Sequence, residues 1–275
     1  MRALLAIVVL AACAAAGGAL FLFSGIYDVA ATDQHRRPVY WLLETAMRQS
    51  VRHHARDVVV PPLTDPAMIA RGRGLHDRHC VRCHGAPGVA PEAFALGMLP
   101  VPANLAHTAR EWEPADLFWV IKHGLKMTGM PAWEYRLVDG DVWAVVAYLR
   151  ILPRQAPRDY GAPASSSAAR SADDGQAHGV PRAPDSRRGQ SAIQQYGCPT
   201  CHEIPGIVGA VAPVGPPLAH MASRPYIAGL LTNNAENMAR WIRSPQQVHR
   251  DSAMPDLGVT ESDARDIAAY LSTLR

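Results

Sequence analysis

Cysteine and lysine are scarce in this sequence. The 275 residues include five cysteines, and the only lysines are Lys122 and Lys126. Four of the cysteines lie in two short motifs, so Cys13 is the only other one. This count excludes a disulfide framework and leaves no spare thiol beyond the N-terminal apolar run to act as a ligand or nucleophile. The net charge of +3 is too weak to indicate nucleic-acid binding. Scarce lysine beside abundant arginine indicates a compositional bias rather than a function.

The pattern Cys-x-x-Cys-His occurs twice, at residues 80–84 and 198–202. It is the attachment signature of c-type haem, in which both thiols add to the vinyl groups and the histidine becomes the proximal iron ligand. The predicted thioether cysteines and proximal histidines are Cys80, Cys83 and His84 in the first motif and Cys198, Cys201 and His202 in the second.

A zinc site and a redox pair are the two alternatives to haem for a Cys-x-x-Cys pair. A zinc site would need its second cysteine pair about 15–20 residues further on, whereas 198 − 83 = 115 residues separate these pairs. A thioredoxin-like redox pair would need a βαβ context, and no strand pattern surrounds either motif. The sequence therefore predicts two covalently bound haem c groups, each with its iron.

An uncharged apolar run covers residues 3–23. As a helix it would span roughly 31 Å, the thickness of a bilayer core. The expected structure is a transmembrane anchor within residues 1–26, oriented by Arg2 on the cytoplasmic side. A lipoprotein processed at Cys13 and a cleaved signal peptide are the alternatives. All three place the rest of the chain outside the cytoplasm.

Composition divides the remainder into four parts. Residues 27–62 form a juxtamembrane segment, and residues 65–153 form a first compact module. Residues 154–186 are rich in Pro, Ala, Ser and Gly and predict a flexible linker. Residues 187–275 form a second module. Such a linker would allow one module to move relative to the other between redox partners.

The two modules repeat one order of helices. Each has a helix before its motif, a Pro-containing loop, a second helix, a Met-Pro pair and a closing helix with an apolar stripe. In the second module, Asn233 and Glu236 predict a capping box for the helix that runs through Trp241. No alternating strand pattern competes, so both modules are predicted to be all-α. The stripes of the closing helices are Val142, Val145, Val146 and Leu149, and Ile267, Tyr270, Leu271 and Leu274.

A methionine thioether opposite the histidine would suit an electron-transfer haem, because it raises the reduction potential and resists displacement. In the first module Met130 is preferred, because Gly129 and Pro131 place it in a loop; Met127 is the alternative.

In the second module Met254 is preferred by the same argument. Met221 and Met238 are the alternatives, and Met238 lies in a helical stripe where methionine usually belongs to the core.

Each proximal imidazole also needs a backbone carbonyl to hold its other ring nitrogen. The candidate acceptors lie in the loops at residues 100–102 and 215–217, although an ordinary rigid turn would have the same sequence.

These features resemble the class I cytochromes c. The matching elements are Cys-x-x-Cys-His after a helix, a Pro-x-x-Leu or Gly-Pro-x-Leu loop, Met-Pro, and a closing helix with Tyr148-Leu149 or Tyr270-Leu271. The run from residue 241 through Met254-Pro255 is similar to the haem domain fused to subunit II of some bacterial haem–copper oxidases. The whole plan resembles bacterial membrane-anchored dihaem cytochromes, which implies two tandem all-α domains behind an N-terminal transmembrane helix.

One pattern departs from that family. Its members usually carry a glycine eight residues and an aromatic residue four residues before the first cysteine of the motif. The first module has Gly72 but His76 in the aromatic position, and the second has Gly189, one residue out of register, and Gln194. We therefore expect the helix packing of both modules to differ in detail.

The resemblance implies an electron carrier rather than an enzyme. Its expected place is the bacterial inner membrane with the haem modules in the periplasm. The donor would be a quinol-oxidising complex or a dehydrogenase, and the acceptor a terminal oxidase. One alternative is an integral haem subunit of an oxidase or dehydrogenase complex. The other, a dihaem peroxidase or thiosulfate dehydrogenase, would need an open iron site or a cysteine ligand.

Overall fold

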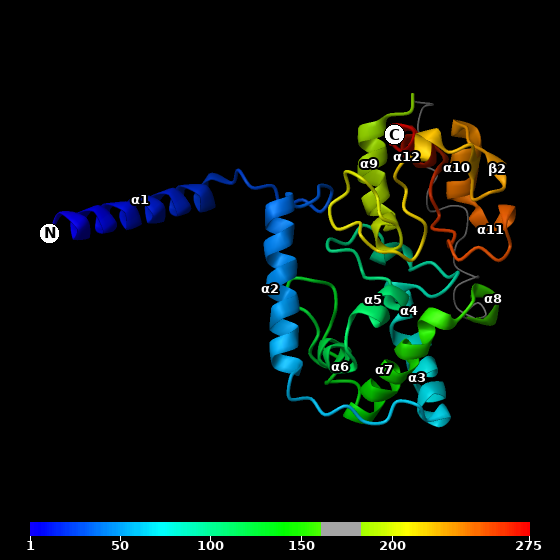
Figure 1. The fold of residues 1–275 in the computed structure, drawn as a ribbon, viewed down its shortest axis with the longest axis horizontal. Helices are drawn as coiled ribbons and strands as arrows, with labels where there is room; N and C mark the ends of the chain where they lie inside the picture. The colour runs from blue at the N-terminus through cyan, green and yellow to red at the C-terminus, as the bar shows by residue number, and fades with distance from the viewer. Residues whose placement is uncertain (161–182) are drawn as a thin grey trace. The chain divides into compact units, whose positions relative to one another are not determined.

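The computed structural model describes residues 1–160 and 183–275, so the central part of the expected linker, residues 161–182, lies outside the described residues. The described chain is mostly helical and forms two compact units, Met1–Asp33 and Gln34–Arg275. Figure 1 gives the order of the elements. The expected all-α class is confirmed, apart from one ribbon of two short strands.

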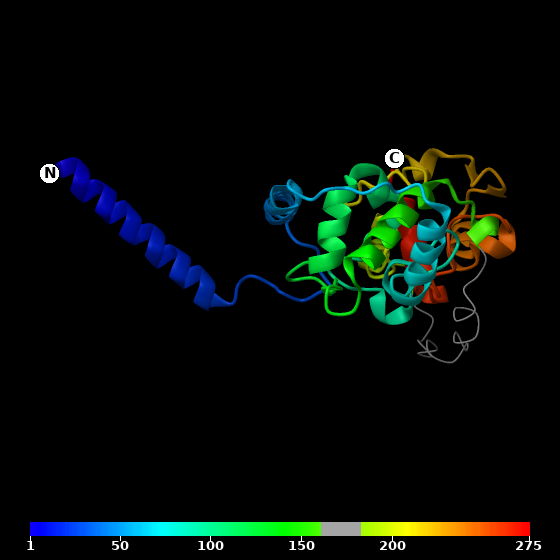
Figure 2. The ribbon, with the colours of Figure 1, turned by 90° about the horizontal axis from the view of Figure 1, so that it is seen from below.

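The first unit contains one helix, α1 (Arg2–Ser24), drawn as a single unbroken rod in Figures 1 and 2. It ends at Gly25, whose φ of 63° is a left-handed conformation that glycine adopts without strain. None of its side chains is buried. Within the described residues, α1 is the one helix long and apolar enough to cross a membrane. It is therefore a candidate membrane anchor.

The juxtamembrane segment contains α2 (Arg37–Ala55), with Pro38 in its first turn as the fixed φ of proline favours. Helix α2 packs against α6 (Pro114–His123), and Val51 and Ala55 of α2 are buried. The His54 ring lies 5.4 Å from the Trp119 ring, centroid to centroid. The segment thus adds a helix to the first module.

The core of the first module is the contact between α3 (Pro66–His79) and α7 (Asp139–Ile151), with α5 (Leu105–Glu111) and α6 beside them. Asp65 caps α3 by accepting a hydrogen bond from the Ala67 amide at 2.9 Å, as the Asp-Pro pair predicts. The predicted stripe of α7 is completely buried.

In the second module, α9 (Ser186–Gln195) packs against α12 (Glu261–Leu271), and α10 (Ala235–Arg243) packs on α12. A two-stranded antiparallel ribbon, β1 (Tyr226–Ile227) and β2 (Leu231–Thr232), precedes α10, and α11 (Pro245–Val248) follows it.

The predicted N-cap of α10, Asn233, is wrong by one residue. Asn234 caps the helix by accepting from the Asn237 amide at 2.8 Å, while the Asn233 side chain donates to the carbonyls of Met221 and Arg224. The Asn233 side chain therefore stabilises the loop before β1 and does not cap α10.

The remaining elements are single turns. They are α4 (Val81–His84), η1 (Ala93–Ala95), η2 (Leu152–Arg154), α8 (Pro157–Tyr160), η3 (Cys198–Thr200) and η4 (Met221–Ser223).

A glycine allows the main helix crossing in each module. A Cβ atom on Gly72 would lie 1.8 Å from the Ala144 carbonyl oxygen of α7. A Cβ atom on Gly189 would lie 2.0 Å from the Asp266 carbonyl oxygen of α12. Both glycines therefore allow close backbone approach, and the one-residue difference in register leaves this role intact.

His76 fills the aromatic position of the first module. Its side chain is fully buried, with its ring 5.1 Å from that of Tyr148 and 6.4 Å from that of Tyr160. Tyr160 is itself buried and donates a hydrogen bond from its hydroxyl to Asp77. Since Tyr160 comes from the segment expected as linker, ordered packing of the first module extends beyond residue 153.

The glycine crossing gives a stability prediction. We expect Gly72→Ala to lower the free energy of unfolding by about 1–3 kcal/mol, because the new methyl group has no room against α7. Gly74→Ala is the matched control in the same helix, because its Cβ would meet no atom within 4 Å. It should leave stability unchanged or raise it by up to ~1 kcal/mol. Guanidinium unfolding of the haem-loaded proteins measures both values, and equal stabilities for the two variants would contradict this role of Gly72.

Candidate haem sites

The first motif begins where α3 ends. The Cys80 amide donates to the His76 carbonyl at 2.8 Å, and α4 carries the chain from Val81 to His84. Nδ1 of His84 donates to the Ala103 carbonyl at 2.7 Å. This acceptor lies one residue beyond the predicted loop at residues 100–102. With Nδ1 acting as the donor, Nε2 carries the lone pair that an iron ion needs.

The second motif is built in the same way. Nδ1 of His202 donates to the Pro216 carbonyl at 2.8 Å, and this acceptor lies inside the predicted loop. The loop passes close to the ring, because a Cβ atom on Gly215 would lie 2.4 Å from Cε1 of His202. Glycine is therefore needed at residue 215 for the carbonyl to reach the imidazole.

Burial keeps the motif side chains neutral. It raises the pKa of the Cys80 and Cys198 thiols to about 12 in each case. It also lowers the pKa of His84 and His202 below the ordinary value, against the opposing effect of the hydrogen bonds to Ala103 and Pro216. Neutral imidazole is the form that binds a metal.

The methionine loop of the first module distinguishes its two candidates. The Leu125 amide donates to the Met130 carbonyl at 3.2 Å, and the Met130 amide donates to Thr128 Oγ1 at 3.0 Å. This turn directs the Met130 side chain onto the hydrophobic core. Met127 is 88% exposed. Met130 is thus partly buried and Met127 exposed, and the choice of Met130 as ligand stays a prediction.

Met254 has a similar backbone setting in the second module. Its amide donates to Ser252 Oγ at 3.2 Å, which parallels the bond between Met130 and Thr128. Met221 and Met238 are buried in the hydrophobic core. Met254 therefore stays the predicted ligand of the second motif.

Met98 is a third methionine near the Met130 loop. Its Sδ lies 3.1 Å from the position that a Cβ on Gly129 would occupy, next to the Met130 loop. The sulfur reaches the loop from a segment about thirty residues earlier in the chain, and no local motif signals this contact.

The donors at each site suit haem c. Within the part of the chain that the structure describes, no group of three or more His, Cys, Asp or Glu side chains is arranged to hold a metal ion. An iron ion held by one imidazole and one thioether therefore needs a macrocycle for its other ligands. Each motif also supplies the two thiols that attach such a macrocycle.

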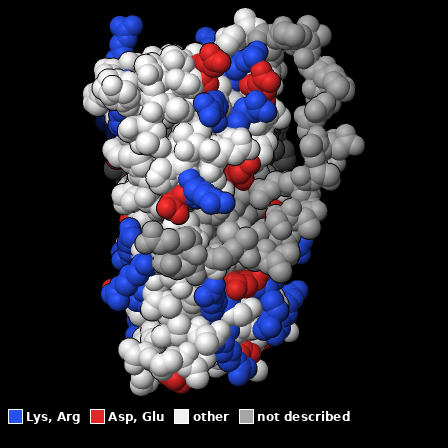
Figure 3. Space-filling view, turned by 90° about the vertical axis from the view of Figure 1, so that its right-hand side faces the viewer, with Lys and Arg blue, Asp and Glu red and all other residues white. Residues whose placement is uncertain are grey.

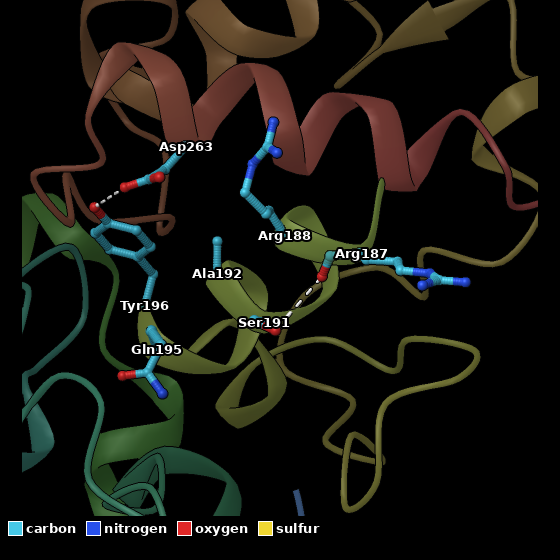
Figure 4. Close-up of a pocket in the computed structure, with 7 residues that line it drawn as sticks. All are labelled: Arg187, Arg188, Ser191, Ala192, Gln195, Tyr196 and Asp263. Atoms are coloured by element: carbon cyan, nitrogen blue, oxygen red, sulfur yellow. Dashed lines mark hydrogen bonds between the residues drawn. The ribbon is translucent and has the colours of Figure 1, made fainter. Parts of the chain in front are cut away.

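A separate hollow lies on the second module between α9 and α12 (Figure 4). Its lining contains none of the motif or methionine residues described above. One side is closed by the Tyr196 hydroxyl, which donates to Asp263 at 2.9 Å. The hollow is therefore distinct from the candidate haem sites. Its lining residues are Arg187, Arg188, Ser191, Ala192, Gln195, Tyr196 and Asp263.

Two families match the chain. Residues 67–149 match the family "Cytochrome C oxidase, cbb3-type, subunit III", and residues 186–275 match the family "Cytochrome c". A curated relative, cytochrome c oxidase subunit 2 of Alkalihalophilus pseudofirmus, is 35% identical over 89 residues. The match covers 32% of this chain and 25% of the relative, so the chain spans about a quarter of that protein's length. No solved structure matches significantly.

Each family match covers one of the two motifs and the helices that surround it. The expected pair of cytochrome c domains is thereby confirmed, together with the apolar helix that precedes them. The chain therefore carries two domains of the cytochrome c type, at residues 67–149 and 186–275, behind an apolar helix that is a candidate membrane anchor.

Proposed function

We propose that each domain binds one haem c, so that the chain is a membrane-tethered dihaem carrier of single electrons. The observation that carries the proposal is the hydrogen bond from each motif histidine to a backbone carbonyl, which leaves Nε2 to bind iron. A haem iron between His and Met cycles between its ferrous and ferric forms. The proposed attachment cysteines are Cys80, Cys83, Cys198 and Cys201, and the proposed iron ligands are His84, Met130, His202 and Met254.

A carrier fits these sites better than an enzyme does. If Met130 and Met254 bind the irons as proposed, no coordination position would be open for a substrate such as a peroxide. A cysteine ligand is also excluded, because Cys13, the only cysteine outside the motifs, lies in α1.

We propose that the chain passes electrons from a quinol-oxidising complex or a dehydrogenase to a terminal oxidase. Both partners would be met at the periplasmic face of a bacterial inner membrane, with α1 as the anchor. On the face drawn in Figure 3, acidic and basic side chains are interspersed. The described residues on this face therefore form no extended patch of one sign for a strongly charged partner.

A second candidate function is a haem subunit of an oxidase complex. It is favoured by the family that matches residues 67–149 and by the relative, both of which are named as cytochrome oxidase subunits. Copurification of oxidase subunits after mild detergent extraction would favour the complex, and isolation of the chain alone would favour the free carrier.

The haem content follows from the two motifs. A pyridine haemochrome assay on the purified chain should give two c-type haems per polypeptide. Replacing both Cys80 and Cys83 by Ser should leave one haem, and so should replacing both Cys198 and Cys201. One haem in the unaltered chain, or haem that acid acetone extracts, would refute the assignment.

Substitution at Met130 tests the sixth ligand of the first haem. Met130→Leu should remove one of two contributions to the weak near-infrared band that reports methionine bound to ferric haem, and should lower that haem's potential. Met127→Leu and Met98→Leu are the controls and should leave the band intact. If either control abolishes the contribution while Met130→Leu retains it, the ligand is assigned to the wrong methionine.

Deletion of residues 3–23 tests the anchor. When a cleavable signal peptide is supplied instead, the shortened chain should be recovered as a soluble red protein with both haems, because α1 is the one candidate span among the described residues. Continued retention in washed membranes would instead assign attachment to residues 27–62 or to a bound membrane partner.

A further inference from the structure

One side chain reaches from the first cytochrome domain to the haem motif of the second. Nδ2 of Asn104 donates a hydrogen bond to Sγ of Cys201 at 3.2 Å. Asn104 directly follows Ala103, whose carbonyl oxygen accepts the hydrogen bond from Nδ1 of His84. A single dipeptide therefore touches both haem motifs.

The capping role of Asn104 fixes the orientation of its amide. Its Oδ1 accepts hydrogen bonds from the Ala106 and His107 amides at 3.0 and 3.2 Å, which makes Asn104 the N-cap of α5. Because the oxygen is occupied in this way, Nδ2 is the atom directed towards Cys201.

Further contacts join the two domains around this hydrogen bond. A Cβ atom on Gly97 would lie 2.4 Å from Oε1 of Gln195, and one on Gly197 would lie 3.4 Å from a methyl carbon of Val101. The segment that leads to Asn104 thus lies against the residues just before and within the second motif.

A second point of attachment lies beside the first motif. Nε2 of Gln246 in the second domain donates to the Gly88 carbonyl at 2.9 Å, four residues after His84. All of these residues belong to the compact unit Gln34–Arg275. The contacts describe docked domains rather than two bodies joined only by their linker.

We infer that Asn104 is a positioning residue that couples the two haem sites for electron transfer within one chain. The inference rests on the proposed binding of two haems. The proposed path of the electron runs from Nδ1 of His84 through the Ala103 carbonyl, the peptide bond and the Asn104 side chain to Sγ of Cys201. Two hydrogen bonds occur on this route and every other step is covalent, so the electronic coupling exceeds that of an open gap.

The reaction moves one electron and no atoms. With a haem bound in each domain, the iron of one domain would be oxidised from ferrous to ferric as the iron of the other would be reduced from ferric to ferrous. No proton is exchanged and no bond is made or broken. The reduction potentials set the direction, and the redox partners of the proposed function supply and remove the electron.

Two substitutions distinguish the hydrogen bond from Asn104 to Cys201 from the capping of α5 by the same side chain. Asn104→Asp keeps a side-chain oxygen for the α5 amides but has no donor for Cys201, and Asn104→Ser keeps the cap but is too short to reach the sulfur. The matched control is Asn234→Asp, the same change at the N-cap of α10, where Asn234 accepts from the Asn237 amide. Equal unfolding curves would show that the three variants retain the fold.

The measurement is electron exchange between the haems of the half-reduced, full-length protein in detergent. Haem-methyl NMR resonances distinguish the two haems and give the exchange rate at several protein concentrations. We expect a rate independent of concentration that falls several-fold in Asn104→Asp and Asn104→Ser and is unchanged in Asn234→Asp.

Two results would overturn the inference. One is an unchanged rate in both Asn104 variants, and the other is a rate in the unaltered chain that rises in proportion to protein concentration. A chain that carries fewer than two haems would overturn the proposed function as well, whereas two haems with an unchanged rate would overturn the role of Asn104 alone.

Discussion

The hydrogen bond from each motif histidine to a backbone carbonyl is the contact on which both candidate haem sites depend. It fixes which ring nitrogen carries the proton and therefore which one can bind iron. The acceptors lie 19 residues after His84 and 14 residues after His202, so each domain must return a loop across its own motif. Backbone at Gly215 comes so close to the ring that any side chain there would collide with it. The loops are thus constrained by the chemistry of the histidine.

The crossings of α3 with α7 and of α9 with α12 position the segments from which these loops extend. Gly72 and Gly189 let the helix before each motif touch the backbone of the closing helix of its domain. The first motif begins directly after α3, and two residues separate the end of α9 from the second motif. Close backbone contact leaves little freedom in the angle between the helices, because the packed atoms cannot interpenetrate. The position of each cysteine pair is therefore set by a crossing that contains no cofactor ligand.

Local patterns in the sequence predicted the motifs, the buried stripes and the Met-Pro turns, because each of these signals spans only a few residues. Such local patterns do not predict contacts between segments that are distant in the sequence. The sequence gives no sign that Tyr160 folds back beside His76, or that Met98 lies next to the loop of Met130. The cap of α10 was misplaced by one residue, because Asn233 and Asn234 are both good capping residues and only tertiary hydrogen bonds select between them.

The composition of the linker suggested two domains that move independently, but the contacts on either side of it favour a docked pair. Helix α2 packs on α6 of the first domain, while Tyr40 at its start lies within 2.8 Å of where a Cβ on Gly209 of the second would be. Gln34 also accepts a hydrogen bond from the Val208 amide at 2.5 Å. The juxtamembrane helix and the segment before Asn104 thus contact the second domain at separate places. Two such attachments resist rotation where one would permit it, so the described contacts hold the two domains as a docked pair.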